Sequence, residues 1–168
     1  PELNLAGVAQ AHLLTETLRP LGMRIIYSSP LQRALQTAEI IGRELHIPVI
    51  VNNDLIEGNF GINEGQYHKD IILTEEYKNW RNLDAEYIHF RFEGGESKYE
   101  IMQRMFAAVS ALLETPEEVI GISSHSAAIR CLMLQFGLKM KRLENGALLR
   151  LTYNDGTWSV EEICDDSE

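Results

Sequence analysis

The sequence is poor in features that mark several classes of protein. Its two cysteines, Cys131 and Cys164, stand far apart among 168 residues, so we expect neither a disulfide framework nor a cysteine metal site. Basic residues number 15 against 25 acidic ones, a net charge of −10, which argues against a nucleic acid or an anionic membrane as partner. No hydrophobic run approaches a membrane span, and no signal-peptide pattern occurs. These absences favour a cytoplasmic protein in a reducing compartment.

Internal repeats, low-complexity segments and linkers are missing as well. Hydrophobic residues make up 45% of the chain and charged residues 24%, as in an ordinary globular protein. A length of 168 residues then predicts a single domain, 1–168, with a sizeable core. Because the chain begins with Pro1 rather than methionine, we expect it to be an incomplete or processed part of a longer protein.

Helical and strand patterns alternate along the chain. Apolar residues at helical spacing predict helices between Asn4 and Pro20, over 31–45, weakly over 71–80, over 98–114 and from about 127 to 136. Short β-branched runs predict strands over 23–27, 48–51, 119–122, 147–153 and 157–163, the last two joined by an Asn-Asp-Gly hairpin turn. Ser29 is the predicted N-cap of the second helix, and Ser97 with Glu100 forms a capping box. The alternation predicts an α/β fold, a three-layer α/β/α sandwich with a mainly parallel central sheet.

Two strand-turn-helix units in this chain look alike. One reads Ile-Ile-Tyr-Ser-Ser-Pro30 and the other Ile-Gly-Ile-Ser-Ser-His125. If their strands are parallel, both turns lie at the same edge of the sheet, where α/β proteins bind ligands. A helix that begins there offers N–H groups and a positive dipole end, which suit an anion. His125 stands at that point, although a histidine that only caps the helix or bonds a neighbouring turn would look the same.

Two further residues fit an anion site at this edge. Arg33, in the first turn of the second helix, opposes the helix dipole unless an anion lies beside it, and its guanidinium matches phosphate or carboxylate oxygens. Glu57 follows a strand in a glycine-rich loop, where an apolar wall of Ile56 and Phe60 would raise its pKa and suit it to general acid catalysis. An arginine and a glutamate that simply face solvent remain alternatives.

Longer motifs in the sequence resemble those of one particular protein family. The sequence Tyr-Ser-Ser-Pro-Leu-Gln-Arg-Ala-Leu-Gln-Thr-Ala over 27–38 closely resembles the signature helix of the histidine phosphatase superfamily, the phosphoglycerate-mutase-like enzymes. Further motifs match the family in the same order: the preceding helix at 5–11, the acid-bearing motif at 55–65, Gly-Gly-Glu-Ser at 94–97, Ser-His at 124–125, and Asn145 with the C-terminal hairpin. The resemblance covers nearly the whole chain and implies the phosphoglycerate mutase-like fold.

The resemblance also implies a mechanism and roles. In such enzymes a first histidine, in an Arg-His-Gly motif on the opening strand, attacks phosphorus. Position by position, Arg33 would clamp the phosphate, Glu57 would protonate the leaving alcohol, and His125 would be the second catalytic histidine, with no metal and no cofactor. Ser126 stands where the family usually has glycine, and its hydroxyl could donate to a phosphate oxygen or narrow the pocket.

The first histidine of the family pattern is missing from this chain. Arg-His-Gly does not occur, and the other histidines, His12, His46, His68 and His89, do not match it. The resemblance places that strand at the centre of the sheet, so we expect it to lie upstream of Pro1; an inactive homologue is the other interpretation.

These observations predict a phosphatase that hydrolyses a small phosphate monoester through a phosphohistidine. A catalytically inactive phosphate-binding or regulatory domain and a phosphoglycerate mutase are the alternatives. A phosphatase is preferred because the segment from Phe60 to Gly94 is short for the substrate-embracing insertion of mutases. The predicted partner is a small phosphorylated metabolite, with neither nucleic acid nor membrane, and a homodimer is allowed. Specificity is expected in segment 65–91, which carries Tyr67, Lys69, Lys78, Arg81 and Arg91.

Overall fold

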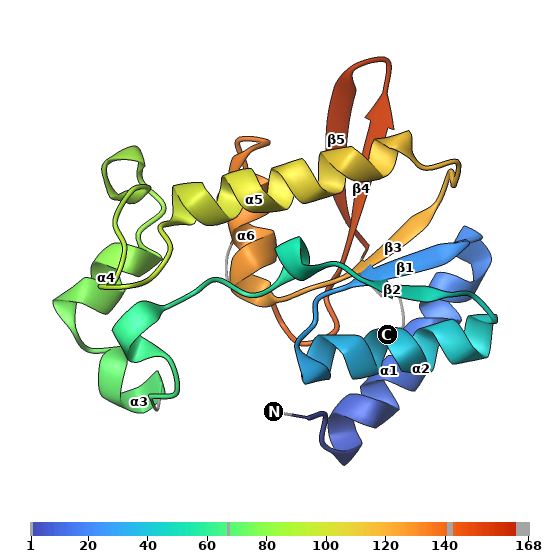
Figure 1. Cartoon of the computed structure of the whole chain (residues 1–168), viewed down its shortest axis with the longest axis horizontal. Helices are drawn as coiled ribbons and strands as arrows, with labels where there is room; N and C mark the ends of the chain where they lie inside the picture. Colours follow the sequence, from blue (N-terminus) through green and yellow to red (C-terminus); the bar gives the residue numbers. More distant parts are fainter. Residues whose placement is uncertain (1, 67, 141–142, 164–168) are drawn as a thin grey trace.

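The computed structural model describes residues 2–66, 68–140 and 143–163. Its α-helices are α1 (Leu5–Leu18), α2 (Gln32–Leu45), α3 (His68–Ile71), α4 (Glu75–Arg81), α5 (Lys98–Ala111) and α6 (Ser126–Leu134). Its strands are β1 (Ile25–Ser28), β2 (Val49–Val51), β3 (Ile120–Ser123), β4 (Leu148–Asn154) and β5 (Thr157–Ile163). Strands and helices alternate as predicted (Figure 1), which confirms the α/β class.

Strand β1 lies at the centre of a three-stranded parallel sheet of order β2-β1-β3. Tyr27 pairs with Ile50 of β2 on one side and with Ile122 of β3 on the other. Strands β1 and β3 are hydrogen-bonded to each other, so the three described strands form one sheet. The additional strand that the family resemblance implied is not among them. That upstream strand stays a prediction.

Helices cover both faces of this sheet, as the three-layer prediction required (Figure 1). On one face, Ile26 packs with Leu18 of α1 and with Ala38 and Ile41 of α2. On the other, Tyr27 packs against the larger core cluster built by α5 and α6, which includes the buried residues Ile101, Met105, Ala128, Cys131 and Met133. Cys131 is buried in this core and packs as a small hydrophobe, whereas Cys164 lies outside the described residues.

The C-terminal hairpin forms a separate two-stranded antiparallel sheet. Leu151 pairs with Val160, and the turn places Asp155 at φ 47° and Gly156 at φ 82°. Two successive positive φ values are what a two-residue hairpin turn requires, and aspartate and glycine tolerate them. Trp158 then packs against Phe106 of α5 and Phe136. The predicted hairpin is therefore confirmed, and aromatic packing attaches it to the core.

Two local predictions were wrong in detail, and a third feature, the length of the helices, bears on the prediction that the chain has no membrane span. Ser29 is not the N-cap of α2: Leu31 holds that position without a side-chain cap, and the Ser29 hydroxyl instead accepts the Leu31 N–H at 3.3 Å. The weak helix expected over 71–80 is two helices, α3 and α4, because Thr74 caps a new helix by accepting the Tyr77 N–H. Among the described residues, no helix combines the length and apolar character that crossing a bilayer requires.

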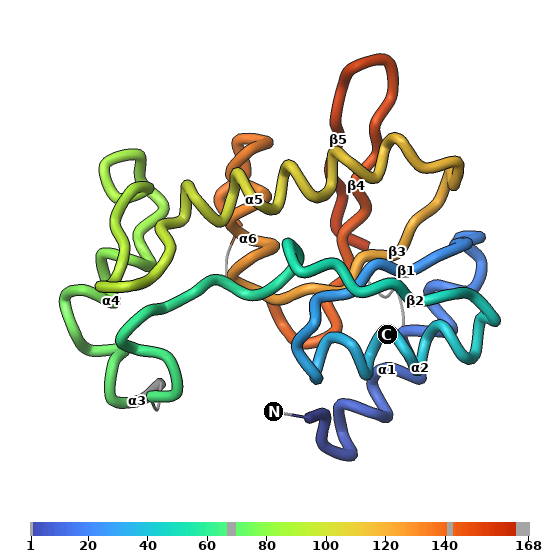
Figure 2. Tube along the Cα trace, in the orientation of Figure 1, coloured from blue at the N-terminus to red at the C-terminus, as the bar shows by residue number. Residues whose placement is uncertain are grey.

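The segment after β2 runs beside α5 towards α3 without regular structure apart from short 3-10 turns (Figure 2). It carries Glu57, and we call residues 52–63 the acid loop. Its far end lies against residues 93–95: Ile62 N–H donates to Glu93 O at 3.0 Å, and a Cβ on Gly61 would lie 2.0 Å from that carbonyl oxygen. Gly61 also has φ 54°, so this close approach needs glycine.

Replacing Gly61 by alanine should therefore destabilise the protein strongly. The added methyl group meets backbone rather than a mobile side chain, so we expect a loss of about 3 kcal/mol or more in the free energy of unfolding. Gly65→Ala is the matched control, since Gly65 has φ 76° but no atom within 4 Å of a Cβ; it should lose only about 1–2 kcal/mol. Urea unfolding of both variants measures the difference, and equal losses would contradict the close contact.

Candidate active site

The two similar strand-turn-helix units meet at one edge of the sheet, as predicted. Ser28 is in register with Ser123, and the Ser29 N–H donates to Ser123 O at 2.9 Å. The Ser123 hydroxyl donates to Ala34 O of α2 at 2.9 Å. Because β1 and β3 are adjacent and parallel, helices α2 and α6 both begin at this edge.

His125 lies directly before α6 and is only 6% exposed. It occupies the N-cap position, but its side chain makes no cap bond to the helix. Its Nε2 is instead 2.7 Å from the Ser29 hydroxyl, at the end of the neighbouring strand. The His125 ring therefore bonds the neighbouring turn rather than capping α6, as the non-catalytic interpretation also allowed, and its catalytic role stays a prediction. The ring links the two units at the sheet edge.

Burial, and secondly the charge of Arg33, lower the pKa of His125 to about 4 from an ordinary 6.5. The ring is therefore neutral at physiological pH. In that state it has one N–H donor and one acceptor nitrogen. A phosphate dianion bound beside it would favour the imidazolium form and raise this pKa.

The titration of His125 gives a testable pH dependence. Because its folded-state pKa lies below the unfolded value, its contribution to stability is fully present above pH 6.5 and is lost as the pH falls towards 4. We expect NMR titration of the His125 ring to give an apparent pKa well below 6.5. Arg33→Ala should raise it part of the way back. A ring that titrates at its ordinary value in both proteins would contradict this environment.

Arg33 is half-buried in the first turn of α2. No hydrogen bond or ion pair joins its guanidinium to another residue in the part of the chain that the structure describes. Its charge nevertheless lowers the pKa of both His125 and Glu57. The guanidinium is therefore within electrostatic reach of both groups and keeps its donors available. Arg33 is therefore not a fully solvent-facing arginine, and its role as a phosphate clamp stays a prediction.

Glu57 is half-buried, and burial raises the pKa of its carboxyl group. Its Oε1 accepts the Gly58 N–H at 3.0 Å and the Ala128 N–H at 2.9 Å. These bonds, another from Ala127 and the charge of Arg33 lower the pKa, but burial is the larger effect. The direction of this shift is the one predicted from burial, and the general-acid role of Glu57 stays a prediction. A further finding is that Glu57 caps α6, so the N–H groups expected for an anion partly serve this carboxylate.

Ser126 is the first residue of α6, and its hydroxyl already has a hydrogen-bond partner. It donates to Leu143 O at a long 3.4 Å, a weak bond that a better acceptor would replace. The neighbouring Ser124 hydroxyl donates to Leu55 O at 2.7 Å and so connects the second unit with the acid loop. A phosphate contact of Ser126 stays a prediction.

Several of the residues expected to set substrate specificity contact other side chains of the protein. Arg91 pairs with Glu100, with 2.7 Å between Nη1 and Oε1, and the Arg81 guanidinium lies 5.9 Å from the centre of the Tyr77 ring. Lys78 pairs with Glu75. Tyr67 and the Lys69 side chain lie outside what the structure describes. Trp80 of α4 packs on Phe60 with ring centres 4.9 Å apart, so this segment adjoins the acid loop.

Two functional candidates were missed by the sequence reasoning. Ser29 was interpreted as a helix cap, although its hydroxyl contacts His125; its place before the second helix, equivalent to that of Ser124, was the available signal. Arg104 lies in the helix predicted over 98–114, where nothing in the sequence marks it out, but it contacts the acid loop. Among the described residues, no group of three or more histidine, cysteine, aspartate and glutamate side chains is placed to hold a metal ion.

An α/β domain with a histidine and an arginine where two parallel strands end, and a half-buried carboxyl group in the adjoining loop, has an arrangement typical of α/β proteins that bind anions. The model of the histidine phosphatase superfamily (branch 1) matches residues 1–166. The chain belongs to this superfamily.

Some of the similar proteins are named as mutases and others as phosphatases. The probable phosphoglycerate mutase GpmB of Yersinia pestis (strain Pestoides F) is 33% identical over 160 residues, which cover 90% of this chain and 74% of that protein. The mycobacterial glucosyl-3-phosphoglycerate phosphatase in complex with inorganic phosphate has a TM-score of 0.82 at 23% identity, covering 95% of this chain and 86% of that one. The alpha-ribazole phosphatase from Shigella flexneri has a TM-score of 0.77 at 24% identity, covering 96% and 83%. These solved structures support the fold.

Proposed function

We propose that this domain acts in the hydrolysis of a small phosphate monoester, through a phosphohistidine formed on a histidine outside the chain. The observation that carries the proposal is electrostatic: the charge of Arg33 acts on both His125 and Glu57. A guanidinium without a hydrogen-bond or ion-pair partner among the described residues, a neutral buried histidine and a carboxyl group of raised pKa thus share the edge where two parallel strands end. These groups suit binding of a phosphoryl group and protonation of a leaving alcohol, and the nucleophile of the proposal is the histidine outside the chain.

Each group has a defined task in the proposed reaction. The guanidinium of Arg33 and the His125 ring hold the phosphoryl oxygens and stabilise their charge. As the bond from nitrogen to phosphorus forms and the bond from phosphorus to oxygen breaks, Glu57 gives its proton to the leaving oxygen. In the second step Glu57 accepts a proton from water, whose oxygen bonds to phosphorus while the nitrogen-phosphorus bond breaks. The site residues proposed here are His125, Glu57 and Arg33, with Ser126 as a substrate contact.

Phosphoglycerate mutase is the second candidate, and the name of the GpmB relatives supports it. A mutase must return the phosphoryl group to another hydroxyl of its substrate, whereas a phosphatase passes it to water. The short segment from Phe60 to Gly94 favours the phosphatase. An inactive phosphate-binding domain is the third candidate, because the chain does not itself contain Arg-His-Gly.

The test is phosphoenzyme trapping combined with product analysis on the full-length protein. We expect a phosphate label that is stable to base and lost in acid, together with release of inorganic phosphate from a small monoester. Isomerised phosphoglycerate without phosphate release would favour the mutase. A folded protein that binds phosphate but never acquires the label would favour the inactive domain.

A further inference from the structure

The acid loop has few means of its own to hold Glu57 in place. Its regular structure consists of two short 3-10 turns, Asn53–Leu55 and Gly61–Asn63. Glu57 stands between them, outside any regular element. Since a general acid must be within hydrogen-bond reach of the leaving oxygen, the position of this loop decides whether Glu57 can act.

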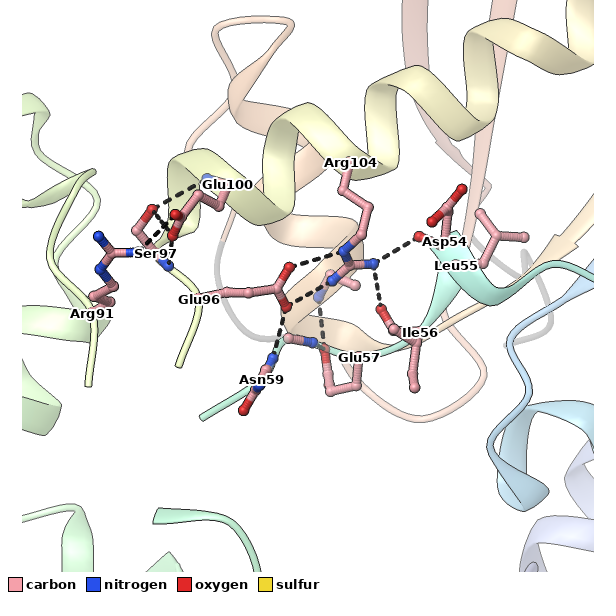
Figure 3. Close-up of polar contacts among 12 residues, drawn as sticks. Asp54, Leu55, Ile56, Glu57, Asn59, Arg91, Glu96, Ser97, Glu100 and Arg104 are labelled. Carbon is pink, nitrogen blue, oxygen red and sulfur yellow. Dashed lines mark hydrogen bonds and ion pairs between the residues drawn. The ribbon is translucent and has the colours of Figure 1, made fainter. Parts of the chain in front are cut away.

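Arg104 of α5 contacts the loop backbone on the near side of Glu57 (Figure 3). Its Nη1 donates to Asp54 O at 2.7 Å and to Ile56 O at 3.1 Å. No strand or helix partner satisfies these two carbonyl groups in the described chain. One guanidinium nitrogen therefore fixes the backbone up to the residue directly before Glu57.

Glu96 fixes the loop on the far side of Glu57. Its Oε2 accepts the Asn59 N–H at 2.9 Å, and its own backbone N–H donates to Asn59 O at 2.8 Å. The same carboxylate takes both remaining arms of Arg104, at 2.9 Å from Nε to Oε1 and 3.0 Å from Nη2 to Oε2. This is a two-bond arginine-carboxylate pair, the geometry that lysine cannot reproduce.

Packing holds the middle of the loop on the same helix. Leu55 and Ile101 are both fully buried. A Cβ on Gly58 would lie 2.6 Å from the Ile101 Cδ1, so the backbone next to Glu57 rests directly on α5. The pair itself is largely shielded from water, with side-chain exposures of 18% for Arg104 and 25% for Glu96.

We propose that Arg104 and Glu96 are positioning residues for Glu57: together they hold the backbone on both sides of it against α5 and so aim its carboxyl group at the edge of the sheet. The inference rests on the proposed role of Glu57 as the general acid. Neither residue is among the groups whose charge shifts the pKa of Glu57, in contrast to Arg33. Their action on Glu57 is therefore geometric, and it differs from the stabilising role of an ordinary surface ion pair.

The first measurement tests position without requiring activity. The Glu57 carboxyl group is titrated by carbon-13 NMR in the wild-type protein, in Arg104→Ala and in Arg104→Lys. We expect the raised pKa of Glu57 to fall towards its ordinary value in both variants, because a released loop exposes the carboxyl group to water. Arg150→Ala, which breaks the exposed pair with Glu161 on the hairpin, is the matched control and should leave the titration unchanged. An unchanged Glu57 titration in a folded Arg104 variant would overturn the proposal.

The second measurement uses the full-length protein and two kinds of substrate. An alkyl phosphate needs its leaving oxygen protonated, whereas p-nitrophenyl phosphate has a stable leaving anion. We expect Arg104→Ala and Glu96→Gln to lower kcat/KM about 100-fold on the alkyl phosphate and less than about threefold on p-nitrophenyl phosphate. Equal losses on both substrates would indicate a merely structural pair and overturn the proposal. A wild-type protein without any phosphatase activity would instead refute the proposed function, and the carboxyl titration would still decide the positioning role.

Discussion

Replacing Glu57 by glutamine should slow hydrolysis of alkyl phosphates by about 100- to 1,000-fold, the contribution typical of a general acid. The amide has no proton to give to the leaving oxygen. On p-nitrophenyl phosphate, where the leaving anion needs no proton, the loss should be far smaller. Steady-state kcat on the two substrates, at one pH and with the full-length protein, measures this contrast. A uniform loss on both would assign Glu57 to binding rather than to proton transfer.

The pH profile supplies an independent check on Glu57. Burial raises its pKa, so the carboxyl group keeps its proton to a higher pH than an exposed glutamate does. With an alkyl phosphate, kcat should fall as the pH rises through this raised pKa, and Glu57→Gln should abolish that limb. The limb should be weak with p-nitrophenyl phosphate in the wild-type protein.

Glu57→Ala separates the chemical role of Glu57 from its structural one. Glutamine keeps an oxygen that can accept the Gly58 and Ala128 N–H groups, whereas alanine leaves the start of α6 without this cap. The alanine variant should therefore lose about 1 kcal/mol of stability that the glutamine variant retains. Thermal unfolding of the two variants measures this difference.

Local patterns in the sequence were enough to predict most of the fold. The two Ser-Ser turns after apolar strands indicated that Arg33 and His125 lie near the same sheet edge, because parallel neighbours end on the same side. The capping box of Ser97 and Glu100 and the Asp155-Gly156 turn formed as expected, since their hydrogen bonds and dihedral angles depend on residues a few positions apart. Such features need no knowledge of tertiary structure.

Contacts between distant residues could not be predicted in this way. Glu57 and Ala128 are 71 positions apart, and Arg104 and Asp54 are 50 apart. Nothing in the local pattern around Glu57 tells which backbone N–H its carboxyl group will accept. The sequence therefore indicated a possible acid without showing that the same carboxylate caps α6. The supporting role of α5 became visible only when the helix was placed beside the acid loop.

Arg33→Ala should weaken the binding of phosphate and vanadate by about 10- to 100-fold, the value of a charge-assisted hydrogen bond. Stability should respond in the opposite direction. A cation in the first turn of α2 opposes the helix dipole, so its removal should leave the melting temperature unchanged or slightly raised, by the equivalent of a few tenths to about 1 kcal/mol. Isothermal titration calorimetry with phosphate and a thermal melt of the same sample measure both effects.

Arg43→Ala provides the matched control for Arg33→Ala, because Arg43 is exposed in the last turn of the same helix. Its charge favours the helix dipole, so its removal should lower stability slightly and leave phosphate binding unchanged. Arg33→Lys should recover only part of the affinity, since a lysine keeps the charge but loses the planar fork. If Arg33→Ala instead lowered the melting temperature in proportion to its loss of affinity, Arg33 would be a structural residue, and the anion site would have to be sought around His125 and Ser126 alone.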